Sequence, residues 1–580
     1  MKSGLIPAVA AIVALLAAVA IPLCVSSFTL TIATTALVYA IFAVSLNLIL
    51  GHGGLPSLGH AAFFGTGAYA VALLTRYGVT DFLIAVGSAI AGSALLGAIV
   101  GPILLRTRAT YFLMASLAVG EVMRNLAMSW RSVTNGDDGI SSLTLPNYLV
   151  DPRVFYFFIL AALVASVALV AMLIRAPFGH TLHAVRDNRS RAAVLGIRPS
   201  TVELTAFVIS AAMAGLAGAM FAYAKAFVSP EVLSVETSAN VLLMVVLGGP
   251  ATLLGPVAGA FVIEAIRGIG STYTQRWLTV LGLIAVVLAL NPGRFLARFL
   301  RTGETRPRKE TAEVSKPVQS VEKATRVLAA APARTALRID NVGKHFGGLS
   351  VLNGVSFKVA EGERRGLIGP NGAGKTTLLN VLSGITRPNR GNVYFGDRNI
   401  TALPAYDRAK LGIGRTFQIC NLFDNSSVRE NMVLALLARE RYALRLGRAL
   451  CRYDTLHAEA SFLLDEWGLR GREDMPVGLL AYGQRRLLEI VLAVAQRPKV
   501  LLLDEPAAGL SGSETKTIIN TISALDPALS LLIVEHDMDL IFSVCDNVTV
   551  LAEGHVLAEG DGDAVRRDKS VVEVYLGAPL

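Results

Sequence analysis

Cysteine and charge are both scarce in this chain of 580 residues. Its four cysteines, at positions 24, 420, 451 and 545, lie far apart without paired spacing, which argues against a disulfide framework and against a zinc site. Charged residues make up 17% of the chain and hydrophobic residues 53%, which is outside the composition of ordinary soluble domains. The length predicts at least two domains, and the composition places one of them in a membrane.

The net charge of +10 does not indicate nucleic-acid binding, because much of it lies in short loops beside apolar runs, as the positive-inside tendency predicts. We therefore expect membrane lipid, and no nucleic acid, as a partner. The apolar run from Leu5 to Leu23 follows Lys2 and resembles a signal peptide. The run is longer than a signal core of about 7 to 15 residues, so we predict a retained first membrane helix.

Six apolar runs precede a basic loop at residues 175–198. The loop contains five arginines and one Asp, so we predict that it is cytoplasmic. The runs lie near 5–24, 28–50, 60–75, 82–105, 111–128 and 155–174. Six crossings that start in the cytoplasm agree with the basic residues at 106–108 and with the absence of Lys and Arg from 132–151.

Three further apolar runs lie near 202–224, 239–266 and 277–290. The downstream stretch "GPNGAGKTT" at 369–377 has the pattern of a loop that binds nucleotide phosphates. Because such a loop needs cellular ATP, the number of crossings after the basic loop has to be even. Gly and Pro interrupt the middle run, so we predict two short helices or a re-entrant element there and about ten segments in total. A single glycine of the stretch 51–69 is expected either to line a solute path or to let helices pack closely, and for the stretch as a whole we favour a solute path.

From residue 301 to 336 the sequence turns to Glu, Lys, Arg, Thr, Pro and Ala without a hydrophobic period, which is typical of a flexible linker. The predicted domains are therefore a transmembrane domain at 1–300 and a nucleotide-binding domain at 337–580. The predicted fold is a two-part chain. A polytopic α-helical membrane domain, with some broken or re-entrant segments, precedes an α/β P-loop domain.

The stretch "GPNGAGKTT" at 369–377 follows a strand-like run and precedes a helix-like run. In this pattern backbone N–H groups cradle phosphates, Lys375 reaches the outer phosphates, and the Thr376 hydroxyl can bind Mg²⁺. The loop residues predicted to bind ATP are Gly369, Asn371, Gly372, Gly374, Lys375, Thr376 and Thr377.

Two acids end the apolar run "KVLLLDEP" at 499–506. A strand that ends there delivers Asp504 to the metal and leaves Glu505 beside the attacking water, as a general base or a water-orienting group. A helix cap would explain one acid but hardly two. A second apolar run, "SLLIVEHDM", leads to His536.

In their order these motifs resemble those of ATP-binding-cassette (ABC) ATPases. The resemblance implies that Phe346 stacks on adenine, although a core position is the alternative for this residue. It also implies that Gln418 in "RTFQ" senses the metal and the membrane domain, and that His536 is the switch histidine. The implied catalytic residues are Glu505, His536 and Gln418, and the implied metal ligands are Thr376, Gln418 and Asp504. The implied signature motif, supplied across a dimer interface, is Ala481, Tyr482, Gly483 and Gln484.

Two positions depart from the family pattern. Ala481 stands where family members usually have Ser, and Ser511 stands where they usually have Asp. Loss of a hydroxyl donor is expected to weaken one nucleotide site, although backbone N–H groups and the helix dipole remain. A heteromeric assembly tolerates one weakened site better than a homodimer, which is the alternative.

The membrane half identifies more closely which ABC transporters this chain resembles. "GHGGLPSLGHAAFFGTGAYA" and "MVVLGGPATLLGPVAGA", together with "VEHDM" and "VYLG" in the ATPase half, resemble branched-chain amino-acid ABC importers. The resemblance implies a natural permease–ATPase fusion in the bacterial inner membrane, with a cytoplasmic ATPase domain and with ATP and Mg²⁺ as cofactors. The implied partners are a second permease subunit, a second ATPase subunit and a periplasmic substrate-binding protein. The basic loop 175–198 would then couple the ATPase to the membrane.

Three alternatives remain open. Importers of urea, amides or aromatic acids belong to the same family. An ABC exporter half-transporter has the same domain order, but its helices are long and carry cytoplasmic stalks. A regulatory or repair ATPase with a membrane anchor needs few spans. Short, glycine-broken spans favour ATP-driven import of branched-chain amino acids or related solutes.

Overall fold

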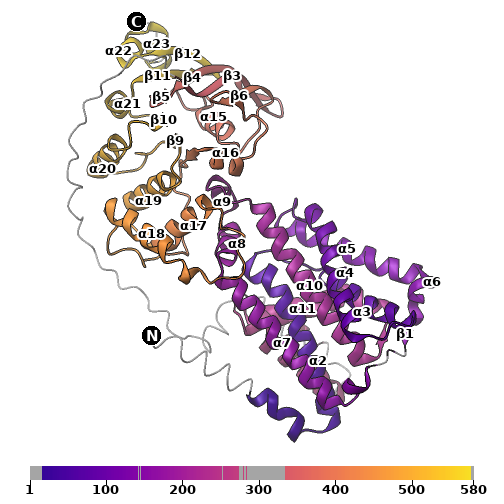
Figure 1. Ribbon diagram of the computed structural model, residues 1–580. Coiled ribbons are helices and arrows are strands. Elements are labelled where there is room, and N and C mark those ends of the chain that lie inside the picture. Colours follow the sequence, from indigo (N-terminus) through magenta and orange to yellow (C-terminus); the bar gives the residue numbers. More distant parts are fainter. Residues whose placement is uncertain are drawn as a thin grey trace. The chain divides into compact units, whose positions relative to one another are not determined.

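The computed structural model describes residues 16–273 apart from 142, 144 and 251, positions 279, 282 and 283, and residues 334–576. The chain divides into two compact units, one helical and one α/β, and the segment Asp187–Pro199 groups with the α/β unit. Figure 1 shows the elements of each unit. Most of the predicted linker, the start of the first apolar run and most of the run 277–290 lie outside the described residues.

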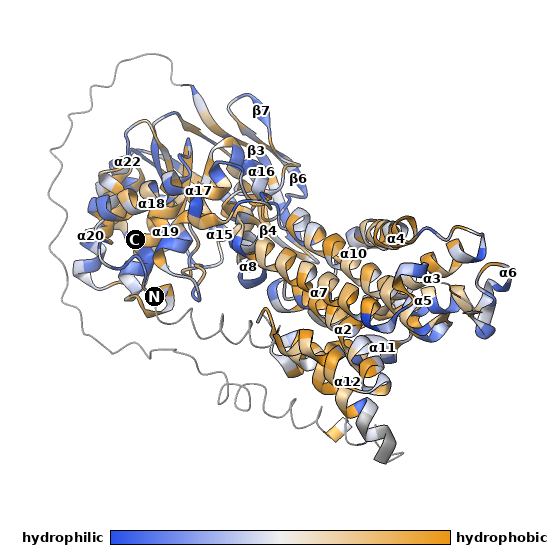
Figure 2. Ribbon diagram, turned by 60° about the horizontal axis from the view of Figure 1, so that its bottom comes forward, coloured by the Kyte–Doolittle hydropathy of each residue, from blue (hydrophilic) through white to orange (hydrophobic). Residues whose placement is uncertain are grey.

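In the helical unit, the apolar runs form helices wherever the structure describes them. The helices are residues 16–24, α2 (Ser27–Asn47), α3 (Ala61–Arg76), α4 (Phe82–Leu104), α5 (Ala109–Ser129), α6 (Arg131–Thr134), α7 (Pro152–Arg175), α8 (Pro177–Asp187), α10 (Pro199–Lys225), α11 (Val235–Gly248) and α12 (Gly255–Tyr273). Four spans among the described residues are long and apolar enough to cross a membrane: 27–52, 82–104, 152–175 and 199–225. The hydropathy colouring of Figure 2 shows that the residues of α4, α7 and α10 are largely hydrophobic.

The long helices differ in how far they are buried. The most apolar window of the α2 span is 89% buried and that of α4 is 22% buried. α2 packs against α7, α11 and α12, so it forms the centre of this unit. Exposed apolar side chains on α4, such as Leu95 and Ile99, suit contact with lipid, where a helix satisfies its own backbone groups.

Helical structure is interrupted at two places in this unit. After α2 the chain forms one π-helical turn, Leu48–His52, and continues without regular structure until α3 begins at Ala61. The run 239–266 is divided because α11 ends at Gly248 and α12 begins at Gly255. Gly249 has φ +92°, a conformation that glycine adopts without the steric cost of a Cβ. The prediction of two short helices in this run is confirmed.

Glycines bring α3 and α10 into close contact. A Cβ on Gly218 would lie 1.9 Å from the carbonyl oxygen of Phe64, and a Cβ on Gly67 would lie 2.2 Å from that of Gly215. Small residues let helices approach closely in a membrane. Close packing is therefore the role of Gly67 within the predicted glycine-rich stretch.

The α/β unit contains two sheets. The six-stranded sheet has the order β12-β11-β5-β10-β9-β8, and the four-stranded antiparallel sheet has the order β4-β3-β6-β7. The first comprises β5 (Arg364–Ile368), β8 (Ile413–Arg415), β9 (Val500–Asp504), β10 (Ser530–Val534), β11 (Asn547–Ala552) and β12 (His555–Gly560). The second comprises β3 (Thr335–Phe346), β4 (Leu349–Ala360), β6 (Arg390–Phe395) and β7 (Arg398–Asn399).

Nine α-helices of the described residues complete this unit after β4. They are α15 (Lys375–Leu382), α16 (Ala405–Leu411), α17 (Val428–Arg439), α18 (Asp454–Glu466), α19 (Tyr482–Ala495), α20 (Gly512–Ser523), α21 (Met538–Val544), α22 (Gly562–Arg567) and α23 (Lys569–Leu576). β5, β8, β9, β10 and β11 are mutually parallel. Their carboxyl ends meet at one edge of the sheet, which is where ligands bind in open α/β sheets.

Candidate functional site

The predicted phosphate-binding loop connects β5 to α15. Gly372 and Gly374 have φ of +83° and +100°, and a Cβ on Gly369 would lie 2.1 Å from the carbonyl oxygen of Leu551. These positions therefore require glycine. Lys375 is the first residue of α15, and its ammonium donates hydrogen bonds to the carbonyl oxygens of Gly369 and Pro370 at 2.7 and 3.0 Å. Burial lowers the pKa of Lys375.

A cavity of about 340 Å³ opens beside the start of α15. The three residues predicted to bind a metal, Thr376, Gln418 and Asp504, all line it. The other lining residues are Asn380, Arg415, Phe417, Ile419, Cys420 and Asn421. No sequence spacing joins Thr376, Gln418 and Asp504, because they come from three separate parts of the chain.

The carboxylate of Asp504 is suited to a divalent cation. Its Oδ2 accepts from Arg415 Nη2 at 3.2 Å, while its buried Oδ1 has no hydrogen-bond partner among the described residues. Burial raises the pKa of this carboxyl, and the neighbouring Arg415 opposes the rise. A carboxylate, a hydroxyl and an amide oxygen form the hard-oxygen donor set that Mg²⁺ prefers, so the residues present fit the ion.

The carboxylate of Glu505 lies between the other two residues predicted to act in hydrolysis. Gln418 Nε2 donates to Glu505 Oε2 at 2.9 Å, and His536 Nε2 lies 2.9 Å from Glu505 Oε1. Glu505 has φ +45°, which is rare for a residue with a side chain and marks strain that the surrounding structure must hold. Its backbone N–H donates to the carbonyl oxygen of Val534 at the end of β10, at 2.8 Å.

The predicted signature residues lie at the start of α19. Ala481 is the N-cap residue of this helix and has no side-chain cap hydrogen bond, as expected for a methyl side chain. None of Ala481, Tyr482, Gly483 and Gln484 lines the cavity beside α15. The structure of one chain therefore does not bring the signature to the phosphate-binding loop.

Two other predicted positions have clear environments. Phe346 is 53% exposed at the end of β3, with the Lys344 ammonium 4.9 Å from its ring centre. This exposure excludes the alternative of a core aromatic. Ser511, at the N-cap of α20, donates its hydroxyl to Glu514 at 2.7 Å, so it serves the start of this helix.

The sequence reasoning missed a group of buried arginines. Arg415, Arg486 and Arg408 are almost fully buried, and burial lowers the pKa of Arg408 to about 10. Arg486 forms an ion pair with Glu489, three residues further along α19, at 2.9 Å. The i,i+3 spacing of opposite charges was the available signal, but such pairs usually lie on exposed helix faces.

The basic loop 175–198 forms two helices, α8 and α9 (Arg189–Val194). α9 belongs to the same compact unit as the nucleotide-binding elements. Asn188 caps α9 by accepting from the backbone N–H of Arg191 at 3.0 Å, and its amide contacts the side chain of Asn421. α9 packs against α16, where Arg198 lies 5.0 Å from the ring centre of Tyr406.

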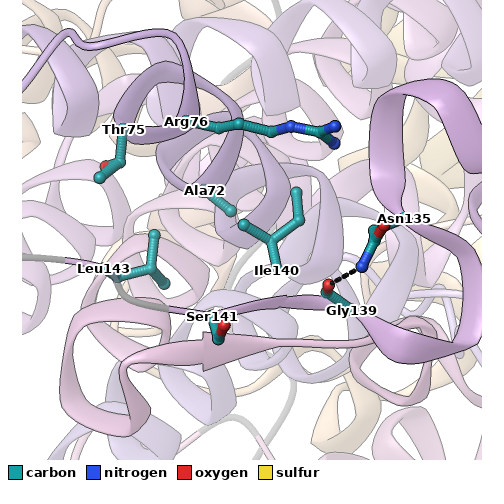
Figure 3. Close-up of a pocket in the computed structure, with 8 residues that line it drawn as sticks. All are labelled: Ala72, Thr75, Arg76, Asn135, Gly139, Ile140, Ser141 and Leu143. Atoms are coloured by element: carbon teal, nitrogen blue, oxygen red, sulfur yellow. Dashed lines mark hydrogen bonds between the residues drawn. The ribbon is translucent and has the colours of Figure 1, made fainter.

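The helical unit has a cavity of its own, of about 380 Å³. Its eight lining residues, shown in Figure 3, are Ala72, Thr75, Arg76, Asn135, Gly139, Ile140, Ser141 and Leu143. Asn135 donates to the carbonyl oxygen of Gly139 at 2.9 Å, which Figure 3 marks with a dashed line. Asn135 and Gly139 have φ of +65° and +67°, so this wall is a tight turn. The strands β1 (Ile140–Ser141) and β2 (Phe227–Val228) pair beside it.

Comparisons with known protein families match both halves of the chain. Residues 28–290 match the family described as the branched-chain amino acid transport system permease component, and residues 352–508 match the ABC transporter family.

Curated relatives match the second half. The high-affinity branched-chain amino acid transport ATP-binding protein BraF of Pseudomonas aeruginosa is 37% identical over 255 residues, which cover 42% of this chain and 99% of the relative. The protein LivG of Escherichia coli, with the same description, is 35% identical over 250 residues, covering 42% of this chain and 97% of the relative.

Solved structures match the same half. A nucleotide-free ATP-binding cassette from an ABC transporter is 31% identical, with 42% of this chain and all of that chain covered (100%) and a TM-score of 0.37. The cbiO1 protein of Clostridium perfringens, part of an ABC transporter complex, is 27% identical, with 42% and 96% covered and a TM-score of 0.36.

Proposed function

Because this chain belongs to the branched-chain amino-acid family of ABC transporters, with a permease component and an ATP-binding component in one polypeptide, we propose that it drives the import of branched-chain amino acids. The chain is an ATP hydrolase and a membrane protein. The proposal adds the direction of transport, the solute, the bacterial inner membrane and a periplasmic binding protein that delivers the solute.

The observation that carries the proposal is the position of Glu505. Its carboxylate lies 2.9 Å from both Gln418 and His536, next to a cavity lined by Thr376 and Asp504. This arrangement fits hydrolysis of a nucleotide phosphate by water, and it occurs in the same chain as the permease component.

In the proposed reaction, the loop 369–377 and the start of α15 hold the phosphates of ATP through backbone N–H groups. Lys375 would exchange its two carbonyl partners, those of Gly369 and Pro370, for phosphate oxygens. Thr376, Gln418 and Asp504 would hold Mg²⁺, which supplies positive charge that stabilises the transferring phosphoryl group. Phe346 would stack on adenine through its exposed ring.

The residues around Glu505 would control the attacking water. Glu505 would accept the proton of this water, and His536 would orient the carboxylate by a hydrogen bond. Gln418 would exchange its hydrogen bond with Glu505 for the metal. The signature residues 481–484 would complete the nucleotide site of a second ATPase subunit, which agrees with their absence from the cavity of their own chain. A second permease subunit completes the proposed heteromeric transporter.

The segment Asp187–Pro199 is the proposed coupling element. It follows α7 and α8 of the helical unit in sequence and precedes α10, yet it groups with the nucleotide-binding unit. Movement of the nucleotide-binding unit would therefore reach two membrane helices through this segment.

The test is transport by the reconstituted complex. The chain, its partner subunits and a binding protein would be placed in proteoliposomes, and ATP-dependent accumulation of labelled leucine would be measured with and without binding protein. We expect uptake that requires both ATP and binding protein and is competed by isoleucine and valine.

Other results would contradict the proposal. Competition by urea, short amides or aromatic acids in place of isoleucine and valine would change the assigned solute. Binding-protein-independent efflux would indicate an exporter, and ATP hydrolysis without solute flux would indicate an anchored ATPase.

A further inference from the structure

Arg191 of α9 is a buried cation in an unusual environment. Its side chain has 0% exposure, and Nη1 lies 3.7 Å from Glu489 Oε1, whose side chain is equally buried. None of its three guanidinium nitrogens has a hydrogen-bond partner among the described residues. An arginine buried in this way costs stability. A stabilising role is therefore a poor explanation for the residue.

The carboxylate of Glu489 also accepts hydrogen bonds from two other groups. Its Oε1 accepts the backbone N–H of Phe417 at 2.9 Å, and its Oε2 accepts from Arg486 Nη1 at 2.9 Å. Arg191 and the Phe417 N–H therefore approach the same oxygen atom. A movement of α9 by less than about 1 Å would bring Arg191 within hydrogen-bond distance of Oε1.

Arg486 connects Glu489 to the residues proposed for hydrolysis. Its guanidinium donates to four backbone carbonyl oxygens, which belong to Phe417, Asp504, Glu505 and Pro506. Two of these carbonyls belong to the proposed metal ligand and the proposed base. The Arg486–Glu489 pair thus holds the strained backbone of Glu505 and the residue before Gln418 at the same time.

We propose that Arg191 is a positioning residue for ATP hydrolysis, and that it competes with the Phe417 N–H for Glu489 Oε1. When α9 moves closer to α19, the charge of Arg191 draws Glu489 Oε1 away from the Phe417 N–H, and that hydrogen bond breaks. Gln418, the next residue, then leaves Glu505 and becomes free to bind the metal. The inference rests on the proposed coupling role of the segment Asp187–Pro199.

The contacts of Asn188 support this assignment. Its amide contacts the side chain of Asn421, which lines the cavity with Phe417 and Gln418. α9 and its N-cap are therefore linked to both ends of the stretch 417–421. Asn188 contacts Asn421 directly, and Arg191 is linked to Phe417 through Glu489. One direct contact and one contact through Glu489 allow a small movement of the helix to displace this stretch.

The first experiment compares Arg191→Met with the wild-type chain in the purified complex. Met keeps much of the side-chain length without the charge. Glu489 then stays on the Phe417 N–H, so we expect the kcat of ATP hydrolysis to fall about five- to tenfold, the size of a typical coupling between sites. KM for ATP should change less than about twofold, because the phosphate-binding loop is untouched.

A matched control and a rescue accompany this variant. Arg189→Met makes the same substitution in the same helix, and it should leave kcat and KM unchanged. Arg191→Lys keeps the charge and should restore part of kcat. The melting temperature of Arg191→Met should not fall, because the variant removes a buried cation without hydrogen bonds.

A double-mutant cycle tests the competition itself. Glu489→Gln keeps an acceptor for the Phe417 N–H but removes the charge that attracts Arg191. If the two residues act together, Arg191→Met should lower kcat much less in the Glu489→Gln background than in the wild-type chain. If Glu489→Gln does not fold, the Arg191→Lys rescue decides the question.

The outcomes separate this inference from the proposed function. A wild-type kcat in Arg191→Met, or full additivity in the cycle, would overturn the role of Arg191 even if import is observed. Because hydrolysis is measured without a transported solute, absence of import would overturn the proposed function and leave this test valid.

Discussion

At the scale of single residues, the strained position of Glu505 is the most informative feature. The backbone of Glu505 has φ +45° and is held by the hydrogen bond from its N–H to the carbonyl oxygen of Val534. Its carboxylate is held by the side chains of Gln418 and His536. Strain of this kind persists only where the surroundings impose it, and it concentrates at functional sites. The structure thus gives the adjacent acids Asp504 and Glu505 different environments, because Asp504 pairs with Arg415 and Glu505 contacts Gln418 and His536.

Replacement of Glu505 by Gln tests its assignment. The amide cannot accept the proton of water, so we expect ATP hydrolysis to fall by about 100-fold or more while ATP remains bound. Hydrolysis rates and retention of labelled ATP on the purified complex measure the two effects. Gln has nearly the same shape, so an unchanged melting temperature serves as the control. Hydrolysis within about tenfold of wild type would contradict the assignment.

At the scale of secondary-structure elements, the ends and contacts of helices determine what each motif can do. α19 begins at the signature with an N-cap residue that has no side-chain acceptor. α3 and α10 touch at glycines where a Cβ would meet backbone atoms. The start of α19 and the contact between α3 and α10 can each be tested by one small substitution.

Ala481→Ser should supply the missing cap of α19. A Ser hydroxyl at this position can accept a backbone N–H of the first turn and stabilise the helix by about 1 kcal/mol. The same hydroxyl can donate to phosphate in the completed site, so the rate of ATP hydrolysis should also rise. Ala481→Val is the control, since it adds a side chain without a hydroxyl. No increase in rate would contradict our account of a weakened signature.

Gly218→Ala should disrupt the contact of α10 with α3. The added Cβ would lie 1.9 Å from the Phe64 carbonyl oxygen, and overpacking of this kind costs about 1 to 3 kcal/mol. Thermal unfolding of the detergent-purified complex measures the loss. Gly87→Ala in α4 is the matched control, because its Cβ would have no atom within 4 Å. Equal melting temperatures for the two variants would refute the packing role.

At the scale of the whole molecule, the chain joins two units that each have a core of their own. The helical unit is centred on α2, and the α/β unit has apolar clusters on its sheets. Curated relatives such as BraF match the second half over 99% of their own length. The covalent connection should therefore raise the local concentration of one unit near the other without being needed for the fold of either.

Division of the chain after Thr311 tests this independence. Residues 1–311 and 312–580 would be co-expressed as two polypeptides. Thr311 is the last residue of the helical unit before the α/β unit resumes at Ala312, and the segment Asp187–Pro199 of the α/β unit stays with the first polypeptide. We expect them to co-purify and to hydrolyse ATP at about half the wild-type rate or more, because α9 still contacts the ATPase surface. Failure of either part to fold would show that the units depend on the connection.

The sequence by itself determined the two-part architecture and the chemistry of the ATPase motifs. Hydropathy, glycine breaks and motif order are local properties, so they predicted the divided run at Gly248–Gly255 and the positions of Lys375, Asp504 and Glu505. Only the tertiary structure decided which of these residues meet. Gln418 and His536 approach Glu505 because parallel strands bring their ends together.

The buried arginines also show that the sequence alone does not predict which residues meet. A sequence presents Arg191 as one of five arginines in a basic loop, and nothing local distinguishes it from an exposed topology signal. Its burial beside Glu489, and the contact of Glu489 with Arg486 and Phe417, arise from packing between segments nearly 300 residues apart in the chain. Such pairings depend on the whole fold, because desolvation and distance are set by all the elements around them.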